Sequence, residues 1–321
     1  MMEFHISAND GGQRADRFIV KACPKLPKNL LYKAFRKKDI KRNGKRCKPE
    51  EILQEGDCIR VYLPADCLEQ QPTKVLHTEL PPPAIVYEDD TLCLMHKSVG
   101  LPVHLDDKGT EDTLVARFLA YLARRGCYDP RKEQSFTPAL CNRLDRNTEG
   151  LVIGAKTAAA LRCINEKIRL GEITKEYLCI TVGAPPKSTD TVIAYHRKEE
   201  GNRVRLESKP FAGCKETKTE YTVLAKKDGL ALVQVRLFTG RTHQIRAQMA
   251  VLGCPILGDG AYGNKETNHR YGEHFQLLTA CRLVFALDTN TPCAISHLAG
   301  KAFSITPAFC SRYFPAIHPM K

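Results

Sequence analysis

Residues 142–151 place a carboxylate, Asp145, between two arginines directly ahead of the apolar run at residues 151–155. The apolar run is typical of a buried strand, so a cluster of charges must meet the edge of the core here. We expect Asp145 to be ionised, because nearby positive charge favours the anion. An ionised carboxylate suits nucleophilic attack or charge stabilisation better than proton donation. This segment alone fits a structural salt bridge or a turn aspartate equally well.

The balance of charge indicates the kind of partner. Lys and Arg exceed Asp and Glu by 13 formal charges in 321 residues. Such an excess indicates a polyanion, and nucleic acid is favoured over an anionic membrane because no lipid-facing helix accompanies the charge. There is no apolar run of about 18 residues and no secretion signal at the N-terminus. We therefore expect a cytoplasmic protein without membrane contact.

Cysteines and glycine motifs give no cofactor site. The fourteen cysteines include no pair at the spacing of a structural zinc site, and the nearest pair, Cys58 and Cys67, is too widely separated. Reduced, partly buried thiols are expected instead. A G-x-G-x-x-G match at residues 258–263 does not lie between a strand and a helix, so we interpret it as a glycine-rich turn. No metal and no cofactor are predicted.

The first unit of the chain, residues 1–66, is predicted to be a small α/β domain. Two short helical patterns start at Arg14 and Asn29, and the second repeats its apolar positions at helical spacing. Asn43-Gly44 is the favoured two-residue turn of a β-hairpin. An alternating strand follows a Gly-Asp turn near residue 57.

The same unit has one-sided charge. Between Lys21 and Lys48 there are twelve Lys or Arg and one acid, Asp39. A solvated helix face normally mixes signs, so this density favours a surface that follows phosphates. The alternative is a small domain that is merely basic. The predicted RNA contacts are Arg36, Lys37, Lys38, Lys41, Arg42 and Lys45.

The rest of the chain divides into a linker and a larger domain. Residues 67–84 are rich in proline and glutamine and are predicted to be a tether that lets the basic domain move. Residues 85–321 contain many strand patterns joined by hairpin turns and few βαβ units. The predicted fold class is therefore α+β, with a mixed, mostly antiparallel sheet.

Three polar loops in the larger domain each hold a side chain of reactive type beside a strand or helix. These side chains are Asp145, Tyr177 and Arg241, whose ordinary alternatives are a salt bridge, a core tyrosine and a phosphate-binding arginine. His243 has no metal-ligand partner nearby and is interpreted as a structural histidine. Thr242 is the predicted N-cap of a helix that follows.

These segments together resemble a known family. The matching motifs are K-x-x-G-L-P-V-H at residues 97–104, R-L-D-x-x-T-x-G-L at 143–151, residues 175–177, and G-R-T-H-Q-I-R at 240–246. With residues 282–285 they make the chain similar to the RluA family of pseudouridine synthases from residue 14 to about 314. The first unit resembles the RNA-binding domain first described in ribosomal protein S-four.

The resemblance implies isomerisation of uridine to pseudouridine in structured RNA without a cofactor. Asp145 would attack the ribose or base, or remove a ribose proton, and the two routes stay open. Tyr177 would stack on the base and assist loss of the C5 proton. Arg241 would pair with Asp145, with Arg246 as the alternative for that role. Further RNA contacts are then expected at Arg143, Arg146, Lys175 and Arg246.

The chain departs from the family at three positions. Asn142 and Thr279 stand where many members have His, and Glu149 stands where many have Ser. Glu149 is expected to face solvent or to cap the following backbone. The departures are expected to affect how the nucleotide is held rather than the chemistry.

Substrate and assembly follow from analogy alone. Ribosomal RNA is favoured over transfer RNA because the basic domain resembles that of relatives that modify the large subunit, and a monomer is expected. The target uridine is not given by the sequence. Two other functions stay open: a non-catalytic RNA-binding or ribosome-assembly protein, and a hydrolase that releases free uracil.

Overall fold

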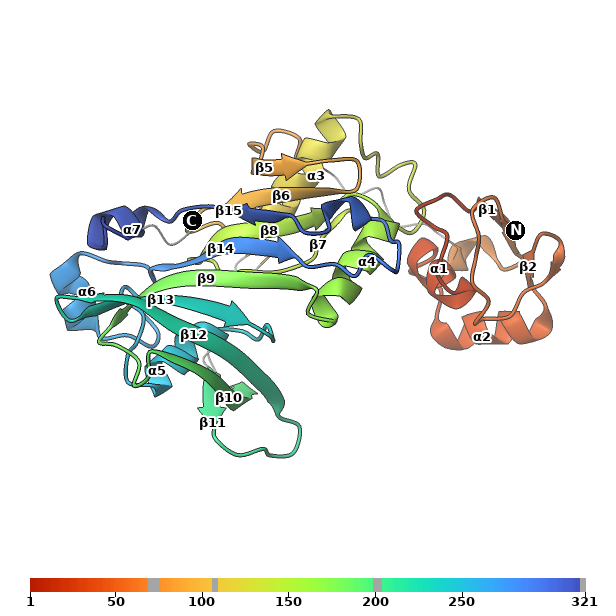
Figure 1. Ribbon diagram of the computed structural model, residues 1–321. Helices are drawn as coiled ribbons and strands as arrows, with labels where there is room; N and C mark the ends of the chain where they lie inside the picture. Colours follow the sequence, from red (N-terminus) through yellow and green to blue (C-terminus); the bar gives the residue numbers. More distant parts are fainter. Residues whose placement is uncertain (69–75, 106–108, 199–203, 318–321) are drawn as a thin grey trace.

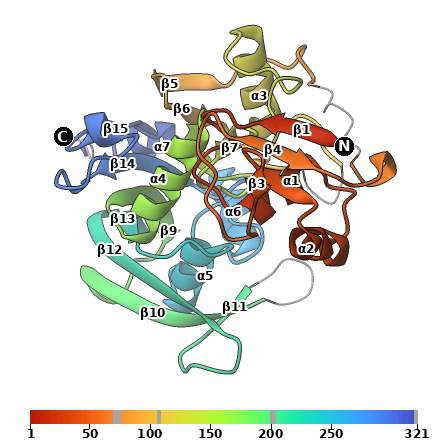
Figure 2. The ribbon, with the colours of Figure 1, turned by 90° about the vertical axis from the view of Figure 1, so that its right-hand side faces the viewer.

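The computed structural model describes residues 1–68, 76–105, 109–198 and 204–317, which form a small and a large domain side by side (Figure 1). Figure 2 views them with the small domain in front of the large sheet. Within these residues no helix is long and apolar enough to cross a membrane. The predicted cytoplasmic location stays a prediction.

The small domain packs two helices against a four-stranded sheet of order β1-β4-β2-β3. Its core includes Phe4 and Phe18, whose rings meet edge to face at 5.4 Å. Asn43 and Gly44 both have positive φ, as the predicted hairpin turn requires. Its elements are β1 (Met2–His5), α1 (Ala15–Ala22), α2 (Lys28–Lys37), β2 (Ile40–Arg42), β3 (Lys45–Arg46), β4 (Cys58–Val61) and the 3-10 turn η1 (Ala65–Cys67).

The large domain is built on an 11-stranded sheet whose main path is β11-β10-β12-β13-β9-β14-β8-β6-β5. Among the described strands every pair is antiparallel except β8 with β14, which confirms the predicted mixed, mostly antiparallel sheet. The strands are β5 (Ala84–Glu88), β6 (Leu92–Lys97), β7 (Ala139–Leu140), β8 (Glu149–Ala155), β9 (Ile173–Val182), β10 (Thr189–Lys198), β11 (Val204–Glu207), β12 (Lys215–Lys227), β13 (Leu230–Leu237), β14 (Leu278–Phe285) and β15 (Ala302–Ser304). The helices are α3 (Leu114–Arg124), α4 (Ala158–Arg169), α5 (Gln244–Val251), α6 (Lys265–Tyr271), α7 (Ala308–Tyr313) and the 3-10 turn η3 (Ser296–Leu298).

The interior strand β8 is covered on both faces, which explains its apolar run at residues 151–155. Val152 belongs to a core that also contains Phe118 of α3, whereas Leu151 and Ile153 belong to a second core with Ile164 of α4. A strand between two apolar layers needs apolar residues at successive positions rather than at alternate ones. The charged loop before β8 is thereby fixed to the most buried part of the sheet.

The small domain is docked on the large one through buried polar contacts. Asp10 has no exposed surface and accepts hydrogen bonds from the Ser135 backbone N–H at 3.1 Å and hydroxyl at 2.6 Å. The Asn9 side chain accepts from the Ala158 N–H, at the first turn of α4, at 3.1 Å. In the structure these contacts join the two domains, and the predicted mobility of the basic domain stays a prediction. Residues 69–75 of that linker lie outside the described residues.

Gly150 is the tightest backbone contact of the parallel pair. It has a φ of 136° and lies opposite Ala280, and a Cβ at Gly150 would meet the Ala280 oxygen at 2.4 Å and nitrogen at 2.5 Å. Gly253 has a φ of 78° but no atom within 4 Å of such a Cβ. Only the first position therefore combines backbone strain with a clash.

We expect Gly150→Ala to lower the free energy of unfolding by about 3 kcal/mol or more, because β14 would have to move. Gly253→Ala should cost only about 1–2 kcal/mol of backbone strain. Chemical denaturation of both variants measures the difference. Equal losses would show that the close approach of β8 to β14 does not constrain the fold.

Candidate active site

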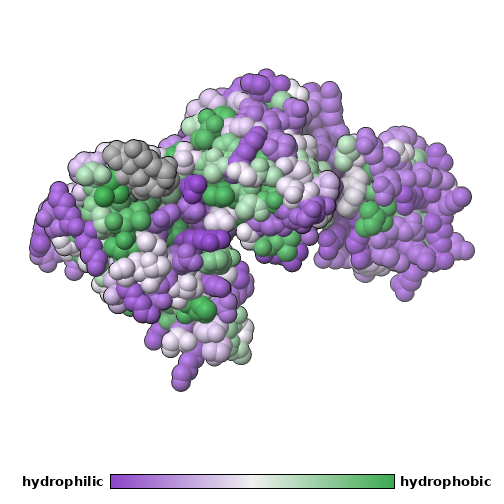
Figure 3. Space-filling model, in the orientation of Figure 1, coloured by the Kyte–Doolittle hydropathy of each residue, from purple (hydrophilic) through white to green (hydrophobic). Residues whose placement is uncertain are grey.

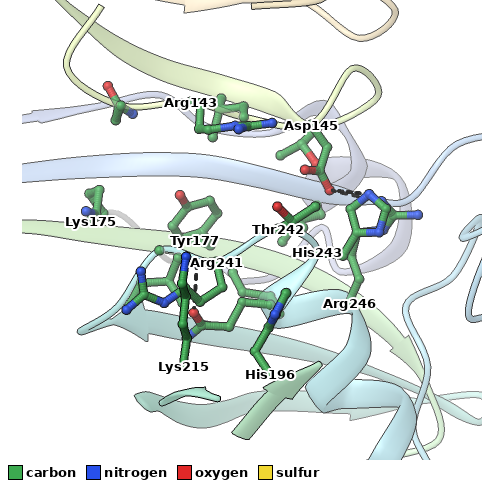
Figure 4. Close-up of a pocket in the computed structure, with 18 of the residues that line it drawn as sticks. Arg143, Asp145, Lys175, Tyr177, His196, Lys215, Arg241, Thr242, His243 and Arg246 are labelled. Carbon is green, nitrogen blue, oxygen red and sulfur yellow. Dashed lines mark hydrogen bonds and ion pairs between the residues drawn. The ribbon is translucent and has the colours of Figure 1, made fainter. Parts of the chain in front are cut away.

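A cavity of about 610 Å³ opens in the large domain and brings the three predicted residues together. Asp145 comes from the loop before β8, Tyr177 from β9, and Arg241 from the loop before α5. In Figure 4 Asp145 and Arg143 lie on one side of the cavity, with Lys215 and His196 on the opposite side. His196 and Lys215 were not singled out in the sequence, because nothing near them in the chain suggests a site.

The Asp145 loop is fastened to β8 by a side chain. The Asn142 Oδ1 accepts from the Ile153 N–H at 2.8 Å, and its Nδ2 donates to the Leu151 oxygen at 3.2 Å. The backbone oxygen of Asp145 accepts a hydrogen bond from the Thr148 N–H, which closes the turn. Asn142, one of the departures from the family, therefore holds the loop itself.

Lys97 ties a second loop to the first. Its side chain has no exposed surface, and its ammonium donates to the backbone oxygens of Ser98, Leu101 and Arg146 at 2.9, 2.7 and 2.8 Å. Burial lowers the pKa of Lys97 to about 8, against the opposing influence of Asp145. Three carbonyl acceptors satisfy the three ammonium donors, so the lysine can be buried while protonated.

The ion pair of Asp145 is made by Arg246, not by Arg241. The Arg246 Nη1 lies 2.9 Å from the Asp145 Oδ2, whereas the exposed Arg241 side chain forms no ion pair with any described residue. Arg241 precedes α5, and its backbone N–H donates to the Gln244 side chain. Arg246 lies within α5 on the buried side. The predicted Arg241 pairing is thus corrected to the alternative, because the helix turns only the later arginine inward.

The other end of Arg246 is held by Asp259. Asp259 has no exposed surface and takes two hydrogen bonds from Arg246, at 2.7 and 2.9 Å. Burial alone would raise the pKa of Asp259, but the hydrogen bonds from Arg246 outweigh it and the pKa is lowered. Asp259 lies in the predicted glycine-rich turn. Its role was missed because no local pattern links it to an arginine elsewhere in the chain.

His243 lies against the same carboxylate. Its Nε2 is 3.7 Å from the Asp145 Oδ2, and its Nδ1 is 3.1 Å from the Tyr262 hydroxyl. Burial lowers the pKa of His243, although Asp145 opposes the shift, so the imidazole is neutral at neutral pH. His243 also occupies the N-cap of α5 with a φ of 53°, so the predicted Thr242 cap is wrong.

Tyr177 forms part of the buried wall of the cavity. It is 5% exposed, and burial, with a further contribution from Asp145, raises its pKa above the ordinary tyrosine value. The Tyr177 phenol therefore stays protonated in the resting site. Lys175, two residues earlier on β9, also lines the cavity, and burial lowers its pKa.

Two of the departures from the family touch each other. The Glu149 Oε1 lies 2.9 Å from the His96 Nε2, and its Oε2 accepts from the Thr279 hydroxyl at 3.3 Å. The hydrogen bond from His96 is the largest cause that lowers the pKa of Glu149. Glu149 is therefore partly exposed, and its carboxylate contacts side chains of β6 and β14 instead of capping the following backbone, which was the other expectation. The Glu149 carboxylate and the Thr279 hydroxyl, which both depart from the family pattern, therefore form a hydrogen bond with each other.

The predicted RNA contacts fall into two regions. Arg143, Lys175 and Arg246 line the cavity with Arg241, and Arg146 is exposed near it with its guanidinium 3.4 Å from the Thr110 hydroxyl. The six predicted contacts of the small domain, which stay predictions, lie on or beside α2, β2 and β3. They are Arg36, Lys37, Lys38, Lys41, Arg42 and Lys45.

Potential metal ligands lie elsewhere. Glu3, His5 and Cys58 offer three ligand atoms within 4.8 Å of one another on the small sheet, the one such group among the described residues. Glu3 is already paired with Arg60 at 2.7 Å. The described residues that line the cavity include no such group.

The comparisons with known proteins agree with this site. A family model described as RNA pseudouridylate synthase matches residues 91–251. The chain belongs to the RNA pseudouridylate synthase family. It is an isomerase of RNA. The matched residues include Asp145, Tyr177, Arg241 and Arg246, but not Asp259 or the small domain, whose resemblance to the S-four domain stays a prediction.

Relatives of this pseudouridine synthase match it over most of its length. "Ribosomal large subunit pseudouridine synthase C" of Yersinia pestis is 32% identical over 87% of this chain and 86% of its own. The protein of the same name from Escherichia coli (strain K12) is 31% identical over 84% and 82%. The solved structure "Human RNA Pseudouridylate Synthase Domain Containing 4" covers 70% of this chain and 89% of that one with a TM-score of 0.53 at 23% identity, which shows a shared fold.

We expect Asp259→Asn to lower the free energy of unfolding by about 3–5 kcal/mol, because Arg246 would lose a buried charged partner. Glu266→Gln, which removes an exposed carboxylate 3.9 Å from Arg270, is the control and should change little. Chemical denaturation at pH 7 measures both.

The pH dependence of the free energy of unfolding is a second test of Asp259→Asn. Because the folded pKa of Asp259 is lowered, its stabilisation is present above the unfolded pKa of about 3.9 and is lost as the pH falls through the folded value. The difference between wild type and Asp259→Asn should therefore shrink in acid. A difference independent of pH would contradict the proposed charge pairing.

Proposed function

We propose that this pseudouridine synthase modifies uridine in large-subunit ribosomal RNA and uses Asp145 as its catalytic carboxylate. Two observations support the substrate: the names of the relatives in Yersinia pestis and Escherichia coli, and the excess of 13 positive charges. Transfer RNA is the alternative substrate.

One observation carries the catalytic role. Among the described residues that line the cavity, Asp145 is the one carboxylate, and five cationic side chains surround the same space. Those cations are Arg143, Lys175, Lys215, Arg241 and Arg246. A polyanion is attracted to such a wall, and its reacting nucleotide then meets a single carboxylate. A glycoside hydrolase would ordinarily need two cooperating carboxylates, so release of free uracil is disfavoured.

The two carboxylate oxygens of Asp145 differ in their contacts. Its contacts with Arg246 and His243 both use Oδ2, and Oδ1 has no hydrogen-bond partner among the described residues. Oδ2 is thus an anchor, and Oδ1 is available to the substrate. The anchored carboxylate can attack the ribose or base, or remove a ribose proton, and the arrangement is compatible with each route.

The other residues handle the nucleotide. The target uridine has to leave its stack to reach the cavity, at a cost of a few kcal/mol that phosphate contacts offset. Arg143, Arg241 and Lys215 are placed to bind the phosphates beside it. Tyr177 packs against the uracil. Because its phenol is protonated in the resting site, it can take the C5 proton only after passing its own proton to a base of the cavity, such as the Asp145 carboxylate. Because isomerisation only replaces the lost C5 proton by one on N1 and leaves the composition of the nucleotide unchanged, no group donor is required.

We expect Asp145→Asn to lower the rate of pseudouridine formation by about three orders of magnitude or more, because the anion is lost while the shape is kept. Tritium release from ribosomal RNA transcripts made with 5-tritiated uridine measures the rate, and carbodiimide labelling locates the product. RNA affinity should change only a few-fold, since the phosphate contacts remain.

Full activity of Asp145→Asn would rule out the catalytic assignment. RNA binding by the wild type without any tritium release would favour the non-catalytic ribosome-assembly alternative. Free uracil among the products would favour the hydrolase. Glu266→Gln serves as the matched control for loss of a carboxylate outside the cavity.

A further inference from the structure

The small domain has a hollow of its own, with a volume of about 380 Å³, between α2 and the segment that follows β3. It is separate from the cavity that contains Asp145, with which it shares no lining residue. The side chains that matter for its chemistry are Tyr32, Phe35, Arg36, Arg46, Cys47 and Lys48.

The inner surface of the hollow is apolar and one wall is aromatic. Phe35 and Cys47 are 2% and 0% exposed, so they form a closed floor. Tyr32 is 46% exposed, so part of its ring is open to a ligand. A flat ring above an apolar floor suits a flat ligand better than a branched one.

The Tyr32 ring is held in place before any ligand arrives. Its hydroxyl donates to the Asp16 Oδ2 at 3.2 Å, and the same carboxylate is bound by Arg14 at 2.8 and 3.1 Å. Asp16 is itself buried, and although burial would raise its pKa, hydrogen bonds from Arg14 and Tyr32 keep the pKa lowered. A ring fixed in this way loses little conformational entropy when a ligand stacks on it.

Three cations surround the hollow without carboxylate partners. Arg36, Arg46 and Lys48 form no ion pair with any described residue, whereas Arg42 on the neighbouring strand is paired with Asp57 at 2.7 Å. The face of the small domain seen in Figure 3 is largely hydrophilic, as expected for a surface that meets a charged ligand. Unpaired cations beside an oriented aromatic ring are the combination that binds single-stranded nucleic acid.

We propose that this hollow binds one unpaired nucleobase of RNA, stacked on Tyr32, with the adjoining phosphates on Arg36, Arg46 and Lys48. A purely apolar ligand would leave the three cations unsatisfied, and free phosphate would not use the ring. The proposal rests on the proposed function only in taking RNA as the ligand. It adds a second contact, specific for a single-stranded nucleotide, outside the cavity.

The chain contains no tryptophan, so one substitution creates a specific fluorescent reporter. Tyr32→Trp in the full-length chain places it in the hollow. Tyr62→Trp is the matched control, because Tyr62 is 41% exposed on the same domain with Lys41 5.2 Å from its ring, yet it does not line the hollow. The probes are oligouridylate, which has bases, and inorganic polyphosphate, which has charge alone.

We expect oligouridylate to cause a saturable loss of emission from Tyr32→Trp and a much smaller one from Tyr62→Trp. Polyphosphate should compete for binding but leave the Tyr32→Trp emission unchanged. Tyr32→Leu should weaken oligouridylate binding about fivefold or more, because a stacked base is lost, and Tyr32→Phe should stay within about twofold. Circular dichroism confirms that the variants are folded.

Three results would overturn the proposal: no change in Tyr32→Trp emission at saturating oligouridylate, an equal change with polyphosphate or in Tyr62→Trp, or wild-type affinity in Tyr32→Leu. Tritium release measured on the wild-type preparation keeps the two proposals apart. If the wild type forms no pseudouridine while Tyr32→Trp emission still responds to the bases, the proposed function fails and the base-binding hollow stands.

Discussion

The Arg246 guanidinium, held between Asp145 and Asp259, is the interaction on which the rest of the site depends. Asp259 is fully buried, and an unpaired carboxylate there would be strongly destabilising. Only arginine offers several N–H donors in a rigid fork, so it can bind Asp259 through two of them and still reach Asp145. The Asp145 carboxylate is thereby positioned by ion pairs inside the protein.

The ion pairs of Arg246 with Asp145 and Asp259 require three segments, far apart in the chain, to meet at one point. The loop before β8 brings Asp145, α5 brings Arg246, and the glycine-rich turn brings Asp259. Lys97 and Gly150 fix the backbone of the first segment, one by hydrogen bonds to carbonyls and the other by allowing β14 to approach. The Asp145 loop is therefore held by an interior strand of the sheet, which suits the proposed role of Asp145, since that role requires exact placement of a carboxylate.

Much of the fold was predictable because its signals are local. The hairpin turn at Asn43-Gly44 needs residues that accept positive φ, and both residues have a positive φ in the structure. The apolar run of β8 and the antiparallel hairpins were also visible, since alternation and turn chemistry act over a few residues. Docking of the small domain by Asp10 was not visible, because a proline-rich linker says nothing about which polar surfaces meet after folding.

The sequence by itself determined which reactive side chains the chain possesses, and motif resemblance pointed to Asp145 and Tyr177. Only the tertiary structure decided their partners. Arg246 rather than Arg241 pairs with Asp145, and Asp259 completes the set from within a turn that looked structural. The physical reason is that helices and turns form from neighbours in the chain, whereas a buried ion pair forms between whichever faces the packed core brings together. Asp145 and Arg246, 101 residues apart, meet only because β8 and α5 pack into one domain.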